Sequence, residues 1–208
     1  MSVAKAYWNK QHSCYTRDEI QIDNWLQQFD TVIRACTTPV IDLGCGSGND
    51  TTYLIEQGKA VIACDFAPNA IANVRRNFPE LLDAKCFDMT EGLPFPDDFT
   101  ELIIADLSLH YFTASVTVAV LRDLKRVLKP DDTLLLRVNS VKDVNHGAGQ
   151  GAELEPHLYQ TADGRLKRFF DEADIRHFFV QWHIEHCKEE EMTRYALPKV
   201  LWTVMCRP

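Results

Sequence analysis

Apolar runs and helical stripes alternate along most of this 208-residue chain. Five short runs rich in apolar residues predict strands, at residues 40–43, 60–65, 84–89, 101–108 and 133–139. The fourth run is almost continuously apolar, as expected of a strand buried on both faces of a parallel sheet. Between the runs, apolar residues recur at the three- and four-residue spacing of amphipathic helices. We predict helices at residues 18–36 (with Asp18 as cap), 51–55, 68–78, 113–129 and 171–181.

The C-terminal part departs from this alternation. Residues 140–170 contain four glycines and several basic side chains without clear periodicity, which predicts a mobile, lid-like loop over the mouth of a site. Residues 182–192 and 199–206 then predict a hairpin at the sheet edge. We therefore expect one α/β domain over residues 1–208, with residues 1–36 as an N-terminal helical cap.

A glycine-rich loop separates the first strand from its helix. Gly44, Gly46 and Gly48 leave three alternate positions without a side chain. A ligand can then lie directly on the backbone, at the positive end of the following helix. Such a loop indicates a nucleotide-like cofactor.

The residues around this loop argue against a dinucleotide. That fingerprint requires glycine at the first, third and sixth positions, but the sixth position from Gly44 is Asn49. Asp42 and Asp50 would also repel a pyrophosphate and attract a ligand with positive groups. S-adenosylmethionine carries an ammonium and a sulfonium and no phosphate. A P-loop is excluded because no Gly-Lys-Ser/Thr follows, and a dehydrogenase remains a remote alternative.

The segment Asp42–Gly48, of sequence Asp-Leu-Gly-Cys-Gly-Ser-Gly, resembles the first motif of class I S-adenosylmethionine-dependent methyltransferases. The compact chain is similar to their small-molecule members, including the tellurite-resistance and thiopurine-methylating groups. The resemblance covers residues 35–140 by motif and the rest by the order of elements. It implies a Rossmann-like, doubly wound sandwich whose mostly parallel, seven-stranded sheet has an antiparallel C-terminal strand. It also implies S-adenosylmethionine as the cofactor.

The resemblance assigns further residues to that cofactor. Asp65, at the tip of the second strand, would accept hydrogen bonds from the ribose hydroxyls; the alternative is a helix cap. Asp88 would accept from the adenine amino group, unless it is a turn residue, and Met89 would offer its backbone N–H. Phe66 would pack on the adenosine, and Trp8 would fold over it. The other expected contacts come from Asp42, Gly44, Cys45, Gly46, Gly48 and Asp106.

The catalytic residue is harder to predict. Methyl transfer from a sulfonium is an in-line displacement in which positioning and desolvation supply much of the catalysis. A general base is needed only if the acceptor still carries a proton at the moment of attack. His110, just past the fourth strand, is the best candidate, with a packed histidine as the alternative, and His146 and His157 are weaker ones. No metal site is expected, because no HExxH or similar ligand spacing occurs.

The acceptor class is narrowed by what is missing. Residues 106–109 replace the Asn/Asp-Pro-Pro-Tyr/Phe motif that marks methylation of amino groups on adenine or glutamine. We therefore expect a small-molecule acceptor. The basic residues within 164–170 could meet an anionic substrate or form a solvated charge run. An RNA or protein methyltransferase, and a non-catalytic cofactor-binding protein, remain alternatives.

Composition adds constraints on partners and location. The net charge of −8 and the pI near 5.3 argue weakly against a broad nucleic-acid-binding surface. The seven cysteines are odd in number and form no CxxC pair, which indicates a reducing compartment without a disulfide framework. The sequence shows no signal peptide and no apolar run of membrane-spanning length. We expect a cytoplasmic protein without a membrane partner, of unknown oligomeric state.

Overall fold

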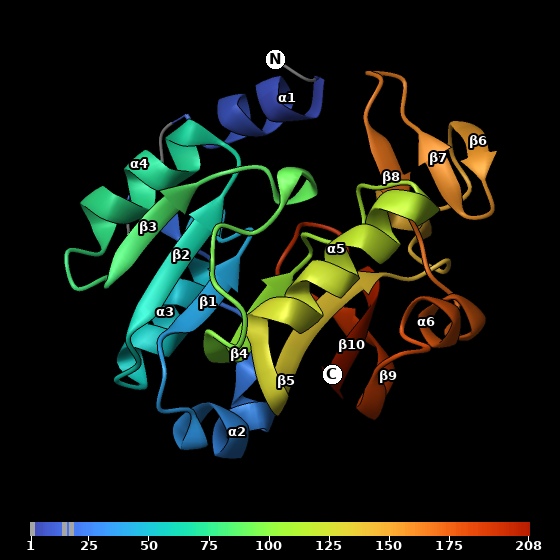
Figure 1. Ribbon diagram of the computed structural model, residues 1–208. Helices are drawn as coiled ribbons and strands as arrows, with labels where there is room; N and C mark the ends of the chain where they lie inside the picture. The colour runs from blue at the N-terminus through green and yellow to red at the C-terminus, as the bar shows by residue number, and fades with distance from the viewer. Residues whose placement is uncertain (1–2, 14–15, 17–18) are drawn as a thin grey trace.

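The computed structural model describes residues 3–13, 16 and 19–208, and its centre is a seven-stranded sheet of order β3-β2-β1-β4-β5-β10-β9 (Figure 1). The strands are β1 (Val40–Leu43), β2 (Val61–Asp65), β3 (Asp83–Cys86), β4 (Thr100–Asp106), β5 (Leu128–Asn139), β9 (His183–Met192) and β10 (Lys199–Arg207). Strand β10 pairs antiparallel with both of its neighbours, while the pairs among β1 to β5 are all parallel. The predicted Rossmann-like sheet with an antiparallel C-terminal strand is confirmed.

Helices cover both faces of this sheet. They are α1 (Val3–Gln11), α2 (Asp30–Ala35), α3 (Asn49–Glu56), α4 (Pro68–Asn77), α5 (Ala114–Val127) and α6 (Glu172–Phe178). Successive side chains of a strand point to opposite faces. Leu102 and Ile104 of β4 accordingly pack in the cluster that contains α2 and α3 side chains, and Ile103 packs in the one that contains α5 and α6. The continuous apolar run in β4 reflects burial on both faces, as the sequence predicted.

The prediction of a helix at residues 18–36 is wrong for its first half. The described helical part starts with a 3-10 turn, η2 (Trp25–Phe29), and continues as α2. Ile22, which supported the helical pattern, is 45% exposed, so the buried stripe begins only at Trp25. The expected cap, Asp18, lies outside the described residues. The third strand is also shorter than expected, because Met89–Glu91 forms a 3-10 turn, η3, capped by the Asp88 carboxylate.

Residues 140–170 are not the predicted loop. After a 3-10 turn, η4 (Val144–His146), they form a second, antiparallel sheet of β6 (Ala152–Glu155), β7 (Leu158–Gln160) and β8 (Leu166–Arg168). Leu158 is fully buried, and buried Arg168 forms an ion pair with Glu155. Strands of three or four residues are too short to show a period-two pattern, which is why the sequence did not predict them.

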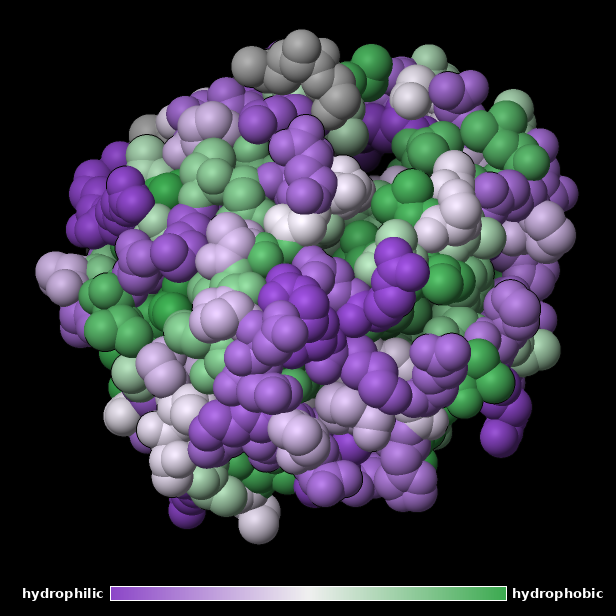
Figure 2. All heavy atoms as spheres, viewed as in Figure 1, coloured by the Kyte–Doolittle hydropathy of each residue, from purple (hydrophilic) through white to green (hydrophobic). Residues whose placement is uncertain are grey.

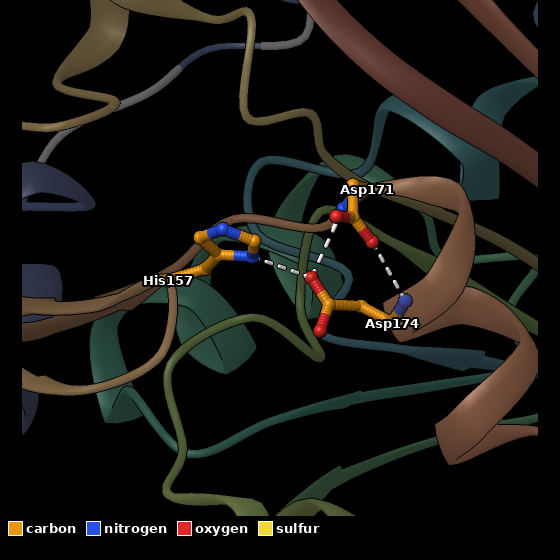
Figure 3. A group of neighbouring side chains, drawn as sticks. All are labelled: His157, Asp171 and Asp174. Atoms are coloured by element: carbon orange, nitrogen blue, oxygen red, sulfur yellow. Dashed lines mark hydrogen bonds and ion pairs between the residues drawn. The ribbon is translucent and has the colours of Figure 1, made fainter.

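The small sheet is joined to α6 by a polar cluster (Figure 3). Asp171 and Asp174 form a reciprocal capping box at the start of α6, and His157 Nδ1 lies 2.7 Å from Asp174 Oδ2. Although the three side chains could offer ligand atoms to a metal, both carboxylates are occupied in capping the helix. We read the cluster as a structural joint that holds the β6–β8 sheet in place.

Candidate functional site

The sheet has a topological switch between β1 and β4, where ligands bind in open α/β sheets, beyond the carboxyl ends of the strands. A cavity of about 760 Å³ opens at this edge. It is lined by the ends of β1, β2 and β4, by α1, and by side chains from β8 and the β9–β10 hairpin. Figure 2 shows the surface hollowed between α1 and the β7–β8 hairpin.

The three glycines of the loop after β1 have different surroundings. All have positive φ, but a Cβ on Gly44 would come within 2.4 Å of Ser108 Cβ, and one on Gly48 within 2.5 Å of Phe78 Cε2. At Gly46 the nearest atom would be Cε1 of His12, at 3.2 Å, another side chain that lines the cavity. Gly46 therefore gives the cavity access to the backbone, while Gly48 is needed for close packing and does not line the cavity.

Three carboxylates gather around this loop. Asp42 lies beneath it, accepts a hydrogen bond from Thr51 Oγ1 at 2.6 Å, and does not line the cavity; burial raises its pKa to about 7. Asp50 accepts from Trp25 Nε1 at 2.8 Å, and burial raises its pKa well above the usual value. Asp65 accepts from the backbone N–H groups of Gly46 and Ala67, at 3.0 and 2.8 Å. These backbone donors fix the Asp65 carboxylate at the tip of β2, in the cavity wall.

Most of the other predicted cofactor residues do line the cavity. These are Trp8, Gly44, Cys45, Phe66, Asp88, Met89 and Asp106. Asp106 is engaged by Arg137, whose Nε and Nη2 donate to its two oxygens at 2.7 and 2.9 Å, and by Arg194 at 3.3 Å. Although burial opposes it, these two guanidinium groups lower the pKa of Asp106. The Asp106 carboxylate thus holds Arg194 in the cavity wall.

The candidate base, His110, also lines the cavity. His110 is 1% exposed, and its Nδ1 has no hydrogen-bond partner among the described residues. Burial, reinforced by Lys199 and Lys167, lowers the pKa of His110 well below 6.5, so the ring is neutral at pH 7. Its neighbour Tyr111 packs against Trp8, with ring centroids 5.7 Å apart.

Several residues that line the cavity were missed by sequence reasoning. Arg194, Tyr195 and Lys199 come from the β9–β10 hairpin, and His12 follows α1. No local pattern marks them, because strand pairing far along the chain brings them to the cavity. Lys167, by contrast, belongs to the basic run within 164–170, and the structure places it in the cavity wall.

Known proteins resemble this chain in sequence and in fold. Residues 40–131 match the family model described as a methyltransferase domain. Malonyl-[acyl-carrier protein] O-methyltransferase from Halorhodospira halophila is 31% identical over 157 residues, which are 74% of this chain and 50% of that protein. The tRNA N(3)-cytidine methyltransferase METTL2 of Gallus gallus is 26% identical over 154 residues, 68% of this chain and 41% of the relative. The chain thus spans half or less of the length of these two relatives.

Solved structures extend the likeness to nearly the whole chain. A Burkholderia thailandensis 1,6-didemethyltoxoflavin-N1-methyltransferase, solved with S-adenosylhomocysteine, has a TM-score of 0.68 at 17% identity, covering 99% of this chain and 87% of its own. TehB from Haemophilus influenzae has a TM-score of 0.68 at 14% identity, covering 98% and 66%. Residues 40–131 of the chain are a methyltransferase domain, and the chain has the fold of S-adenosylmethionine-dependent methyltransferases. Domain and fold together support S-adenosylmethionine as the cofactor, as the sequence predicted.

The methyltransferase cavity fits this cofactor. A volume of about 760 Å³ lies in the upper part of the range for ligand sites, which leaves room for an acceptor beside the donor. The side chains of Asp50 and Asp65, beside the glycine loop, suit the ammonium and the ribose hydroxyl groups of the cofactor. Trp8 and Phe66 offer aromatic surface. Among the described residues of this methyltransferase, no helix is long and apolar enough to cross a membrane.

Proposed function

We propose that the chain, as one domain over residues 1–208, catalyses methyl transfer from S-adenosylmethionine to a small-molecule acceptor in this cavity. The observation that carries the proposal is that one cavity is lined by two unlike groups of residues. One group, here named the loop end, is the backbone of Gly46 with the Asp65 carboxylate that it donates to. The other, here named the acceptor end, is His110 with Lys167 and Lys199, which act on its ring electrostatically. When bound, S-adenosylmethionine supplies a methyl group that is already activated on a sulfonium.

Residues at the loop end would hold the adenosine part. Asp65 would accept hydrogen bonds from the ribose hydroxyls, since backbone donors already fix the orientation of its carboxylate. Asp88 and the backbone N–H of Met89 would bind the adenine, with Phe66 packed beside it. Trp8 would cover this part from α1.

The remaining predicted residues would act around the methionine part. Gly44, Cys45 and Gly46 would present backbone along it, whereas Asp106 would act through Arg194. Asp42 and Gly48 would instead support the loop from below, because neither lines the cavity.

His110 would be the general base where the acceptor carries a proton. A ring that is neutral at pH 7 can accept a proton, and the position of His110 in the cavity wall supports this role. The low pKa makes it a weak base, so much of the catalysis would come from positioning and desolvation. An acceptor that attacks as an anion would not need it.

Small-molecule and tRNA methyltransferases both occur among the relatives, so the acceptor class needs an argument from this chain. Tyr7 of α1 and Arg165 of the β7–β8 hairpin both line the cavity and pack on each other, with the guanidinium 3.6 Å from the tyrosine ring centroid, so together they cover part of it. Such cover favours a small molecule over a polymer, and the net charge of −8 works in the same direction. The six described cysteines are all free, which supports a cytoplasmic location as part of the proposal.

The proposal is tested by calorimetric titration of the protein with S-adenosylmethionine and S-adenosylhomocysteine. We expect both to bind, and Asp65→Ala to weaken binding about a hundredfold, because it removes charge-assisted hydrogen bonds. Asp83→Ala is the matched control, since that exposed carboxylate pairs with Lys85 away from the cavity. Absence of binding in the wild type, or equal binding by both variants, would refute the proposal.

A further inference from the structure

Positive charge gathers in the lining of the cavity. Arg165 and Lys167 come from the β7–β8 hairpin, and Arg194 and Lys199 from the β9–β10 hairpin. The protein as a whole carries a net charge of −8, so this concentration of cations goes against its composition. Four basic side chains from two hairpins, in the lining of one cavity, need an explanation.

Protein carboxylates compensate only part of this charge. Lys199 Nζ pairs with buried Asp143 Oδ2 at 2.5 Å, Arg165 with Asp163 at 2.8 Å, and Arg194 with Asp106. Lys167 differs from these three. Its Nζ donates to the backbone oxygen of His146 at 2.5 Å and has no ion-pair partner among the described residues.

Keeping Lys167 charged in this partly buried position also costs free energy, because the ammonium loses part of its hydration. Burial and the neighbouring Lys199 lower the pKa of Lys167 to about 8, so the ammonium stays mostly protonated at pH 7. Asp143 acts in the opposite sense but is already paired with Lys199, and the Phe169 ring lies 5.5 Å from the Lys167 ammonium. The charge of this half-buried cation is therefore compensated only in part, which is destabilising. The site therefore favours a ligand that brings a negative charge.

An independent observation points to the same place. His110 lines the cavity, is only 1% exposed, and has an Nδ1 atom without a hydrogen-bond partner among the described residues. Buried polar atoms are rarely left unpaired in folded proteins. Both Lys167 and Lys199 act on the His110 ring electrostatically, so the three groups lie close together.

We propose that the methyl acceptor is a small anion, whose charged group binds to Lys167 and Lys199 beside His110. This inference rests on the proposed function. A carboxylate or a compact oxyanion would complete the compensation of the Lys167 charge, with charge-assisted hydrogen bonds from both ammonium groups. Its negative charge would also offset the effect of the two lysines on His110, which makes the imidazole a better proton acceptor when the acceptor is bound.

The test titrates anions into the protein saturated with S-adenosylhomocysteine. Benzoate represents organic carboxylates, inorganic phosphate represents compact oxyanions, and benzamide is the neutral counterpart of benzoate. We expect benzoate or phosphate to bind with millimolar affinity or better, and benzamide not to bind. Binding of benzoate alone assigns an organic acid, and binding of phosphate alone assigns an oxyanion.

The variant Lys167→Met separates this site from general charge effects. It leaves no carboxylate without its partner, so we expect the fold to be kept, and anion affinity to fall at least about tenfold. Lys188→Met is the matched control, because Lys188 is exposed on β9 and pairs with Glu190. It should leave anion affinity unchanged.

Three results would overturn the inference. They are no anion binding by the wild type, equal anion binding by both variants, and a loss of S-adenosylhomocysteine affinity in Lys167→Met, which would assign the lysine to the cofactor. Failure of the wild type to bind S-adenosylhomocysteine would instead refute the proposed function. Anion titration of that same sample would still decide whether the basic site exists.

Discussion

The two ends of the cavity differ in charge and in construction. The loop end is rich in carboxyl groups, those of Asp42, Asp50 and Asp65, and burial raises the pKa of all three. The acceptor end is basic, with Lys167 and Lys199 from hairpins far along the chain. A cationic donor would favour the ionised form of these carboxyl groups, and an anionic acceptor would suit the two lysines, so each end would select the charge of its own ligand.

The largest effect is expected at the loop end, from Gly46→Val. A β-branched side chain at φ +51 is strained, and its Cβ would meet the His12 ring at 3.2 Å in the cavity. We expect complete loss of S-adenosylmethionine binding by calorimetry. Gly58→Val is the matched control, because Gly58 has φ +72 but a Cβ added there would meet nothing within 4 Å. It should lower the melting temperature while keeping the affinity, and equal affinities in both variants would contradict our account of the loop.

The next largest effect is expected from His110→Ala at the acceptor end. If His110 is the general base, turnover on an acceptor found in the anion titrations should fall by about a hundredfold or more. S-adenosylmethionine affinity should change little, since the ring lies at the other end of the cavity. His177→Ala, at an exposed histidine on α6, is the control. Turnover like that of the wild type would make His110 a packing residue.

A smaller effect concerns pH and sharpens the contrast of charge. The ammonium of Lys167 faces Lys199, Arg165 and Asp143, and burial lowers its pKa to about 8. Anion binding needs the protonated form, so benzoate affinity should be steady below pH 7 and fall about tenfold for each pH unit well above the lysine pKa. Binding of the anion raises that pKa and shifts the fall upward. In Lys167→Arg the fall should disappear from this range, whereas an unchanged pH profile would assign it to another group.

The smallest effect is expected from Asp88→Ala. Its carboxylate Oδ1 already accepts hydrogen bonds from Thr90 N and Oγ1, at 3.0 and 2.7 Å, in a partly exposed turn. A contact to adenine there would add roughly 1 kcal/mol, or about fivefold in affinity. Thr90→Ala separates the support of the turn from the contact itself. A loss as large as that of Asp65→Ala would show that Asp88 contributes more than its exposure suggests.

The contrast also explains what could be predicted from sequence. The loop end was predictable because Gly46 and Asp65 lie within a local strand–loop–helix–strand unit whose geometry follows from the order of residues. Lys199 was missed because only the antiparallel pairing of β10 with β5 brings it to the cavity. Asp42 and Gly48 show a subtler limit. The motif marks them, but it does not say whether a side chain faces a ligand or packs under the loop, and the structure has both packing under the loop.

Helix α1 lines the cavity and contacts both α4 and the β7–β8 hairpin. None of its residues is buried, and its backbone meets α4 through Asn9, which bonds twice to Asn69, while Tyr7 stacks with Arg165 of the β7–β8 hairpin. An element held by such side-chain contacts can detach without unfolding the core. Each ligand that orders α1 from its own end lowers the entropic cost of ordering it for the other ligand. Donor and acceptor affinities would then be thermodynamically coupled, and the coupling factor must be the same in both directions.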